Sequence, residues 1–151
     1  MSAFDFQFGL TEIVPSKQDE RERQSVSTFR VLVEKTLTPL VMASQTFPSK
    51  KEVVVFIIQF FASERNYKSR DVDNIGKTIL DCLKGKLYID DSQVRTLLIT
   101  KKMSPKVPNN FVFIGLKELH GETDIDVVKS MLLQQAIVLY QTSVKSPISV
   151  S

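Results

Sequence analysis

The hydrophobic positions along the chain alternate with polar ones in some stretches and are continuous in others. In residues 4–8, phenylalanine alternates with aspartate and glutamine, which predicts a half-buried strand. Residues 52–61 are rich in Val, Ile and Phe, which predicts a central strand covered on both faces. Residues 93–102 and 111–114 have the composition of two further strands. The apolar pattern therefore predicts four strands.

Between and after these strands, apolar residues return at helical spacing. Residues 25–37 predict an amphipathic helix that Pro39 kinks or ends. Residues 73–84 predict a second helix, with Gly85 as its C-terminal stop. Residues 123–142 predict a third helix, which opens with a capping box.

The order of these elements, β-α-β-α-β-β followed by a C-terminal helix, is typical of an α+β fold with a mixed sheet. A chain of 151 residues is long enough for one such domain. We therefore assign residues 1–142 to a single domain, in which residues 123–142 form an added helix, and residues 143–151 to a flexible tail. The added helix is expected to rebuild a dimer, to bind a partner protein or to cover a sheet face, and the last is favoured.

Charge is distributed unevenly along the chain. The sequence carries 20 Lys and Arg against 17 Asp and Glu, a net charge of +3. Residues 65–106 alone hold ten bases and five aspartates, a net charge of +5, so the remainder carries −2. A basic segment favours a polyanion such as nucleic acid as partner. An ordinary solvated, lysine-rich surface explains the charge alone equally well.

Composition argues against several classes of protein. Cys82 is the single cysteine, so no internal disulfide framework exists, and no Cys/His cluster has zinc-site spacing. The longest apolar run, residues 53–58, is far shorter than the roughly 20 residues that span a bilayer. The first residues lack the basic region of a signal peptide. We expect a cytoplasmic, nucleoid-associated protein with no membrane partner.

Aspartates cluster inside the basic segment. Asp71 and Asp73 are two residues apart, a spacing that turns both carboxylates to one side of an extended segment. Asp73 is expected near the N-cap of the following helix, where Asp73, Lys77 and Asp81 share one face at intervals of four residues. Close carboxylates repel one another unless a cation lies between them, which favours a divalent ion.

A third carboxylate comes from Asp90-Asp91, which precedes the third strand. If that strand lies beside the start of the helix, this carboxylate meets the first two. Oxygen ligands of this kind suit Mg²⁺, or Mn²⁺, and phosphodiester chemistry, in which Lys77 would stabilise developing charge. Each part also has a structural interpretation: Asp73 as a cap only, Asp73–Lys77 as a surface pair, and Asp90-Asp91 as a plain turn.

The chain resembles the RusA family of Holliday junction resolvases in the segment Arg70-Asp71-x-Asp73-Asn74-x-x-Lys77-x-x-x-Asp81-x-Leu83, followed by Asp90-Asp91-x-Gln93-Val94. The resemblance implies that Asp71, Asp73 and Asp91 bind the metal and that Lys77 is the essential lysine. It further implies that Arg70 contacts DNA and that Asp90, Asn74 and Asp81 support the site. Further DNA contacts are expected from Arg65, Lys68, Lys101 and Lys102.

The resemblance also implies a Mg²⁺-dependent homodimer that nicks symmetric strands of a four-way DNA junction, a metal-activated water attacking the phosphodiester. The first and second strands are candidate contributors to the dimer interface. The alternative hypothesis is a non-catalytic, structure-selective DNA-binding protein that keeps the fold. A phosphohydrolase acting on small nucleotides is disfavoured by the width of the basic segment. Catalysis requires that the carboxylates meet within one metal shell.

Overall fold

The structure is a computed structural model in which residues 4–16, 23–120 and 137–143 are described. The chain divides into two compact units, residues 1–119 and 120–151. In the second unit, residues 137–143 are helical and expose the apolar side chains of Ile137, Val138, Leu139 and Tyr140. Most of the predicted C-terminal helix, its capping box and nearly all of the tail lie outside the described residues.

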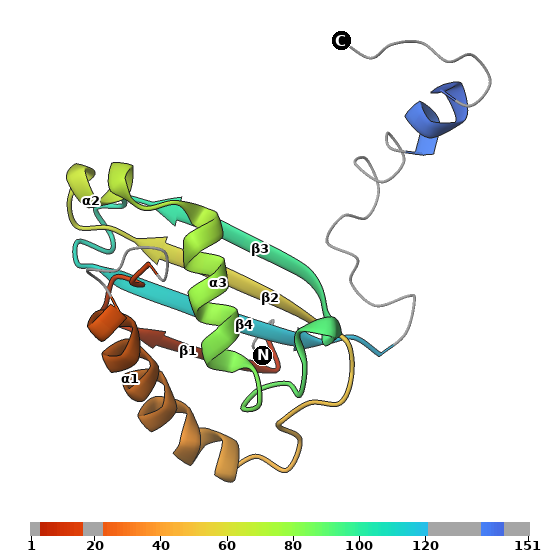
Figure 1. Cartoon of the computed structure of the whole chain (residues 1–151), viewed down its shortest axis with the longest axis horizontal. Coiled ribbons are helices and arrows are strands. Elements are labelled where there is room, and N and C mark those ends of the chain that lie inside the picture. Colours follow the sequence, from red (N-terminus) through yellow and green to blue (C-terminus); the bar gives the residue numbers. More distant parts are fainter. Residues whose placement is uncertain (1–3, 17–22, 121–136, 144–151) are drawn as a thin grey trace. The chain divides into compact units, whose positions relative to one another are not determined.

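The first unit is built on a four-stranded mixed sheet (Figure 1). Its strands are β1 (Phe6–Leu10), β2 (Val53–Phe60), β3 (Val94–Lys102) and β4 (Phe111–Glu118). They lie in the order β1-β4-β2-β3, with β2 parallel to β3 and the other pairs antiparallel. The helices are α1 (Arg23–Met42), α2 (Glu64–Ser69) and α3 (Val72–Leu83), with a short 3₁₀ helix, η2 (Asp91–Gln93). Because β2 and β3 are parallel, α3 must return the chain antiparallel to both strands.

Helices α1 and α3 lie on the same face of the sheet, and the core lies beneath them (Figure 1). Val33 and Leu37 of α1 and Ile79 of α3 are almost fully buried, as are Val55 and Ile57 of β2. These residues recur at helical or alternating spacing, so each element contributes one apolar side to the core.

Two glycines shape α3. A Cβ at Gly76 would lie 2.5 Å from Ile99 Cδ1 and 3.4 Å from Leu97 Cδ2, so the absence of a side chain lets α3 pack closely on β3. Gly85 has φ +81° immediately after the helix, a conformation that glycine adopts without steric cost. The predicted C-terminal stop at Gly85 is confirmed.

The opposite face of the sheet carries half-buried aromatic side chains. Alternate positions of β2 and β4 place Phe56, Phe60 and Phe113 on this face, and Phe4 packs edge-on against Phe56 and Phe113, with ring centroids 5.1 Å and 5.5 Å away. The prediction that β2 is a central strand is confirmed. The prediction that both of its faces are covered is wrong for the described helices, because both main helices lie on one side.

The four strands and the helices near residues 25–37 and 73–84 are confirmed, with ends shifted by a few residues. Pro39 does not end α1, which continues to Met42 and is followed by a hydrogen bond from Ala43 N–H to the Pro39 carbonyl oxygen. The short helix α2 was not predicted. Within the part of the chain that the structure describes, no helix combines the length and apolar character needed to cross a membrane.

Candidate functional site

A cavity of about 250 Å³ lies beside the start of α3. It is lined by Val14, Ser16, Ser69, Arg70, Asp71, Asn74 and Ile75. Asp71 is the N-cap residue of α3, with an extended backbone, but its side chain makes no capping hydrogen bond. Its exposed carboxylate is therefore not committed to the helix. Arg70 also lines an adjoining cavity of about 600 Å³ near the start of α1.

The side chain of Asn74 also lines this cavity. Its Oδ1 is buried and has no hydrogen-bond partner among the described residues. A buried polar atom without a partner carries a free-energy cost of about 1–3 kcal/mol. An amide oxygen and the Asp71 carboxylate are hard ligands of the kind that Mg²⁺ accepts, so this donor set fits a hard divalent cation or its bound water.

The loop that forms the other wall of the cavity is held by two residues that sequence reasoning missed. Gln59, fully buried at the end of β2, accepts a hydrogen bond from Val14 N–H at 3.0 Å and donates to the Glu12 carbonyl oxygen at 3.0 Å. Thr78 of α3 donates its hydroxyl proton to the Pro15 carbonyl oxygen at 2.9 Å. A polar glutamine in an otherwise apolar strand was the available signal, because buried polar groups need partners.

Lys101 is bonded to the backbone that leads into α3. Its ammonium group donates to the carbonyl oxygens of Tyr67, at 2.7 Å, and Arg70, at 2.8 Å, and lies 4.5 Å from the centroid of the Tyr67 ring. A lysine at the end of a helix satisfies the last carbonyl groups there. Lys101 therefore holds the connection between α2 and the Asp71 N-cap.

Asp73, Lys77 and Asp81 lie on one face of α3, as their spacing predicts. Asp73 and Lys77 are exposed, and Asp81 is half-buried. Asp73 lies near the N-cap, as predicted: Asp71 is the cap, and Asp73 is in the first turn of the helix, which begins one residue earlier than predicted. The expectation that Asp71 and Asp73 turn their carboxylates to one side assumed an extended segment. Because Asp73 is already helical, that reasoning does not apply to this pair.

Asp91 opens η2, immediately before β3, and lies in a tightly hydrogen-bonded turn. The hydroxyl of buried Tyr88 lies 3.0 Å from the Leu80 carbonyl oxygen and 3.2 Å from Asp91 Oδ1, and these two acceptors share its single proton. Burial, reinforced by the negative charge of Asp91, raises the pKa of the Tyr88 phenol, which keeps it protonated as a donor.

Gln93 and Asp90 complete this turn as a reciprocal capping box. Gln93 Nε2 donates to the carbonyl oxygens of Ser49 and Lys51, both at 2.8 Å, and its Oε1 accepts from Asp90 N–H. Hydrogen bonds from Ser92, together with the nearby Lys84 ammonium, lower the pKa of Asp90 to about 2. Asp90 and Gln93 thus hold the turn that presents Asp91.

Within one chain, the structure does not bring Asp91 to Asp71 and Asp73. In the described residues, none of these three aspartates belongs to a group of three or more His, Cys, Asp or Glu side chains whose ligand atoms lie within 4.8 Å of one another. The expected meeting is wrong for a single chain because β3 is parallel to β2. The start of β3 therefore lies beside the end of α3 rather than beside its beginning.

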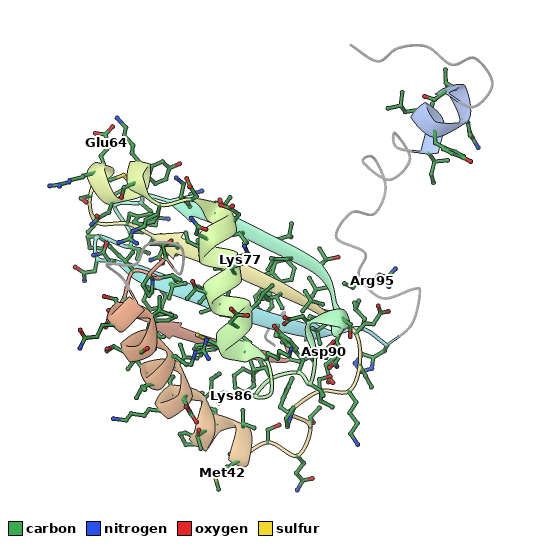
Figure 2. The ribbon with its side chains drawn as sticks, in the orientation of Figure 1. Met42, Glu64, Lys77, Lys86, Asp90 and Arg95 are labelled. Carbon is green, nitrogen blue, oxygen red and sulfur yellow. The ribbon has the colours of Figure 1, made fainter. Side chains whose placement is uncertain are left out.

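The remaining predicted DNA contacts lie on exposed surface. Arg65 and Lys68 are on α2, where Lys68 pairs with Glu64 at 3.0 Å, and Lys102 ends β3. An exposed pair of this kind stabilises the fold little and leaves the lysine able to contact an anion. All three lie near the end of the sheet where α3 begins, and Glu64 marks this end in Figure 2.

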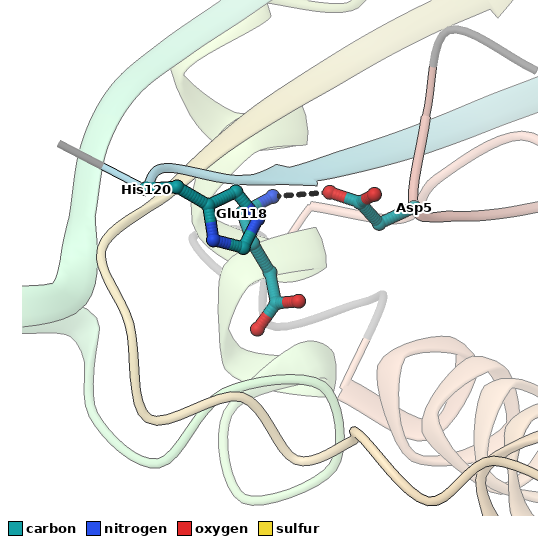
Figure 3. A group of neighbouring side chains, drawn as sticks. All are labelled: Asp5, Glu118 and His120. Carbon is teal, nitrogen blue, oxygen red and sulfur yellow. Dashed lines mark hydrogen bonds between the residues drawn. The ribbon is translucent and has the colours of Figure 1, made fainter. Parts of the chain in front are cut away.

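Asp5 and Glu118 also place carboxylate oxygens within 4.8 Å of one another. Asp5 accepts a hydrogen bond from Glu118 N–H at 2.7 Å (Figure 3), and buried Glu118 accepts one from the Ser49 hydroxyl. Both acids therefore have protein partners that explain their positions.

The sequence model of the endodeoxyribonuclease RusA family matches residues 15–114, which is more than half of the chain. The chain belongs to the RusA family. The match extends from Pro15, in the loop beside the cavity, into β4 and contains every residue that we predicted for the site. None of the curated proteins compared with the chain matches it.

Membership of the RusA family makes the chain an endodeoxyribonuclease, a hydrolase that acts on DNA. The residues at the start of α3 suit this chemistry. Arg70 and Lys77 offer positive charge to phosphate, and Asp71 and Asn74 offer oxygen ligands at one cavity. RusA nucleases depend on a metal ion, and these donors fit one.

Proposed function

We propose that this protein resolves Holliday junctions as a Mg²⁺-dependent endonuclease that makes paired, symmetric nicks. The observation that carries the proposal is the cavity at the start of α3, where Asp71 lies beside the unpartnered Asn74 Oδ1 and Arg70 in a RusA-family chain. The metal would activate a water molecule and neutralise charge on the scissile phosphate. Mn²⁺ would serve the same ligands.

The protein's own residues take separate roles in this proposal. Asp71, Asp73 and Asp91 hold the metal, and Lys77, one turn after Asp73, stabilises charge that develops on the phosphate. Arg70, Arg65, Lys68, Lys101 and Lys102 are proposed to bind adjacent phosphates, with Asn74, Asp81 and Asp90 in support. Lys101 reaches DNA only if its ammonium shares its carbonyl partners with a phosphate.

The proposal includes a homodimer in the cytoplasm, where branched DNA associated with the nucleoid is the substrate. Two symmetric cuts are needed for ligatable products, and a twofold dimer places two identical sites in that relation. Both backbone edges of β2 are paired within the sheet, so this strand could contribute only its exposed face to an interface.

A second candidate is a structure-selective DNA-binding protein that does not cut. The observation that favours it is the separation of Asp91 from Asp71 and Asp73 within one chain. The basic residues near α2 would serve either function.

Cleavage of a synthetic four-way junction distinguishes the two. In Mg²⁺ we expect paired, symmetric nicks in the junction and none in linear duplex, with a loss of at least about 100-fold in Asp73→Asn. Tight junction binding without nicks would establish the binding protein instead. Glu64→Gln, which removes an exposed carboxylate of α2 outside the cavity, controls for the loss of one negative charge.

A further inference from the structure

The larger of the two cavities that Arg70 lines has no role in the proposed cleavage. It has a volume of about 600 Å³ and lies between the loop at residues 11–15 and the beginning of α1. This volume is within the range of about 300–1,000 Å³ that is typical of pockets for small organic groups. Because Arg70 also lines the smaller cavity beside Asp71, the two cavities adjoin at one positively charged side chain.

The lining combines buried apolar side chains with exposed hydroxyl groups. Pro15 and Phe29 are buried, whereas Ser25 and Thr28 are exposed. Ser25 and Thr28 are three residues apart on α1 and therefore lie on one side of the helix. A nucleobase has two apolar faces and an edge of hydrogen-bond donors and acceptors, so it matches a lining of this kind. A metal ion or a free phosphate would not need the apolar walls.

Two polar groups of the lining are already oriented by the protein. Asn110 Oδ1 accepts a hydrogen bond from Ala62 N–H at 2.8 Å, which leaves its NH₂ group as the donor that it can offer to a ligand. Thr28 donates its hydroxyl proton to the Gln24 carbonyl oxygen at 2.9 Å, so its oxygen can only accept from a ligand. The cavity therefore offers a donor before β4 and an acceptor on α1.

The loop that lines both cavities is held in place by the core. Buried Gln59 of β2 bonds to Val14 N–H and to the Glu12 carbonyl oxygen. Thr78 of α3 donates to the Pro15 carbonyl oxygen. Because β2 and α3 fix this loop, the wall of the cavity exists before a ligand binds, which lowers the free-energy cost of binding.

We propose that the larger cavity receives one unpaired base of the DNA, next to the phosphate that is cut. This inference rests on the proposed nuclease function. Arg70 holds the phosphate that links this nucleotide to the cut. A base inside a continuous duplex must unpair and unstack before it can enter a pocket, and the cost is least where pairing and stacking are already disrupted, as at a branch point. The cavity thereby directs cutting to the branch point and away from linear duplex.

Filling the cavity tests this role without metal or cleavage. The fluorescent base 2-aminopurine, whose emission rises when it leaves the stack, is placed in turn at each nucleotide beside the branch point of a four-way junction. In EDTA, we expect binding of the wild-type protein to raise the fluorescence at one of these positions. Ser25→Phe places a ring in the cavity, so this variant should bind the junction without the rise.

Ser27→Phe is the matched control. Ser27 is also an exposed serine of α1, but it lies two residues further along, on the opposite side of the helix, and does not line the cavity. This variant should keep the rise. If thermal unfolding shows that Ser25→Phe does not fold, Thr28→Phe fills the cavity from the same side of α1. A rise that the filled cavity retains, or no rise at any position with the wild-type protein bound, would overturn the proposal.

An abasic junction gives a second readout, by cleavage in Mg²⁺. We expect Ser25→Phe to nick the intact junction at least about tenfold more slowly than the wild-type protein, because the base no longer fits its pocket. When the base at the fluorescent position is removed, no group has to enter the cavity, so the variant should nick at close to the wild-type rate. An equal defect on both junctions would show that the added ring acts in another way and that the proposal is wrong.

The two readouts distinguish the base cavity from the nuclease function. If the fluorescence rises with the wild-type protein and is lost in Ser25→Phe, but no junction is nicked in Mg²⁺, the nuclease function is wrong and the base cavity stands. If the wild-type protein nicks junctions without any rise, and Ser25→Phe nicks them equally well, the base cavity is wrong and the nuclease function stands. If the wild-type protein neither binds nor nicks a junction, both are wrong.

Discussion

Lys101 illustrates how a single residue can take a role that its charge does not reveal. It belongs to the basic segment and was predicted to bind DNA, yet its ammonium donates to two backbone carbonyl oxygens that precede Asp71. Its neighbour Lys102, with the same charge, lies on the other side of the strand and is exposed. Variants of the two lysines can therefore distinguish a role in positioning the Asp71 segment from a role in binding phosphate.

We expect Lys101→Met to destabilise the protein by on the order of 2 kcal/mol, because two charge-assisted hydrogen bonds are lost. The rate of cleavage at saturating junction should fall, while the salt dependence of junction binding stays close to wild type. Lys102→Met should instead lower the slope of log affinity against log salt by about one unit. Thermal unfolding and salt-dependent binding measure both effects. A lower salt slope in Lys101→Met, with an unchanged cleavage rate, would identify Lys101 as a phosphate contact.

Helix α3 and the turn before β3 show how elements position the site. Gly76 allows α3 to lie close to β3, and Gln93 with Asp90 closes the turn that holds Asp91. The position of α3 depends on one close contact and the turn on one capping box, so each can be tested by changing one side chain.

A double-mutant cycle tests the packing of α3. Gly76→Ala introduces a Cβ that meets Ile99 Cδ1, and Ile99→Val removes that carbon atom. We expect the double variant to be more stable than the sum of the two single changes predicts, by about 1 kcal/mol, because the clash is gone. Denaturant unfolding measures the free energies. Simple additivity of the two changes would show that α3 accommodates the methyl group elsewhere.

The Asp90 carboxylate makes the turn sensitive to acid. Its pKa falls from an ordinary value of 3.8 to about 2 in the folded protein because Ser92 and Lys84 stabilise the charged form. A lowered pKa contributes stability that is present above pH 4 and is lost as the pH falls from about 4 to 2. The stability difference between wild type and Asp90→Ala should therefore shrink over this range, as measured by unfolding at each pH. A difference independent of pH would show that the carboxylate charge does not contribute.

At the scale of the whole molecule, the sheet has one face covered by helices and one aromatic face, and the proposed site is divided between its two ends. One chain with this arrangement places positive charge and two of the three proposed carboxylate ligands, Asp71 and Asp73, near α2, and the third, Asp91, at the other end of the sheet. Because a junction needs two symmetric cuts, resolution is expected to depend on a dimer.

Light scattering of the purified protein should give a mass of twice the chain mass of 17.1 kDa. Dilution that dissociates the proposed dimer should abolish paired cuts more steeply than in proportion to concentration, because two symmetric cuts need two copies of the chain. Paired cuts that stay proportional to concentration in a preparation shown to be monomeric would contradict this expectation.

Much of the fold could be predicted because strands and helices follow local periods. Alternating phenylalanines, the apolar run at residues 52–61 and the spacing of α3 each depend on neighbours a few positions away. The motif around Asp71 was likewise sufficient to indicate the family, because a motif depends only on residue identity and spacing. The helix α2 was missed because its six residues contain no buried side chain and so leave no apolar pattern.

The sequence by itself determined the elements, the family and the residue types available for metal and phosphate. Tertiary structure alone decided which of them meet. The parallel pairing of β2 and β3 places the start of β3 beside the end of α3, and this separates Asp91 from Asp71. The same topology brings Lys101 to the Arg70 carbonyl oxygen and Gln59 to the cavity loop. Such contacts join residues dozens of positions apart, and local spacing carries no information about the direction in which a chain returns.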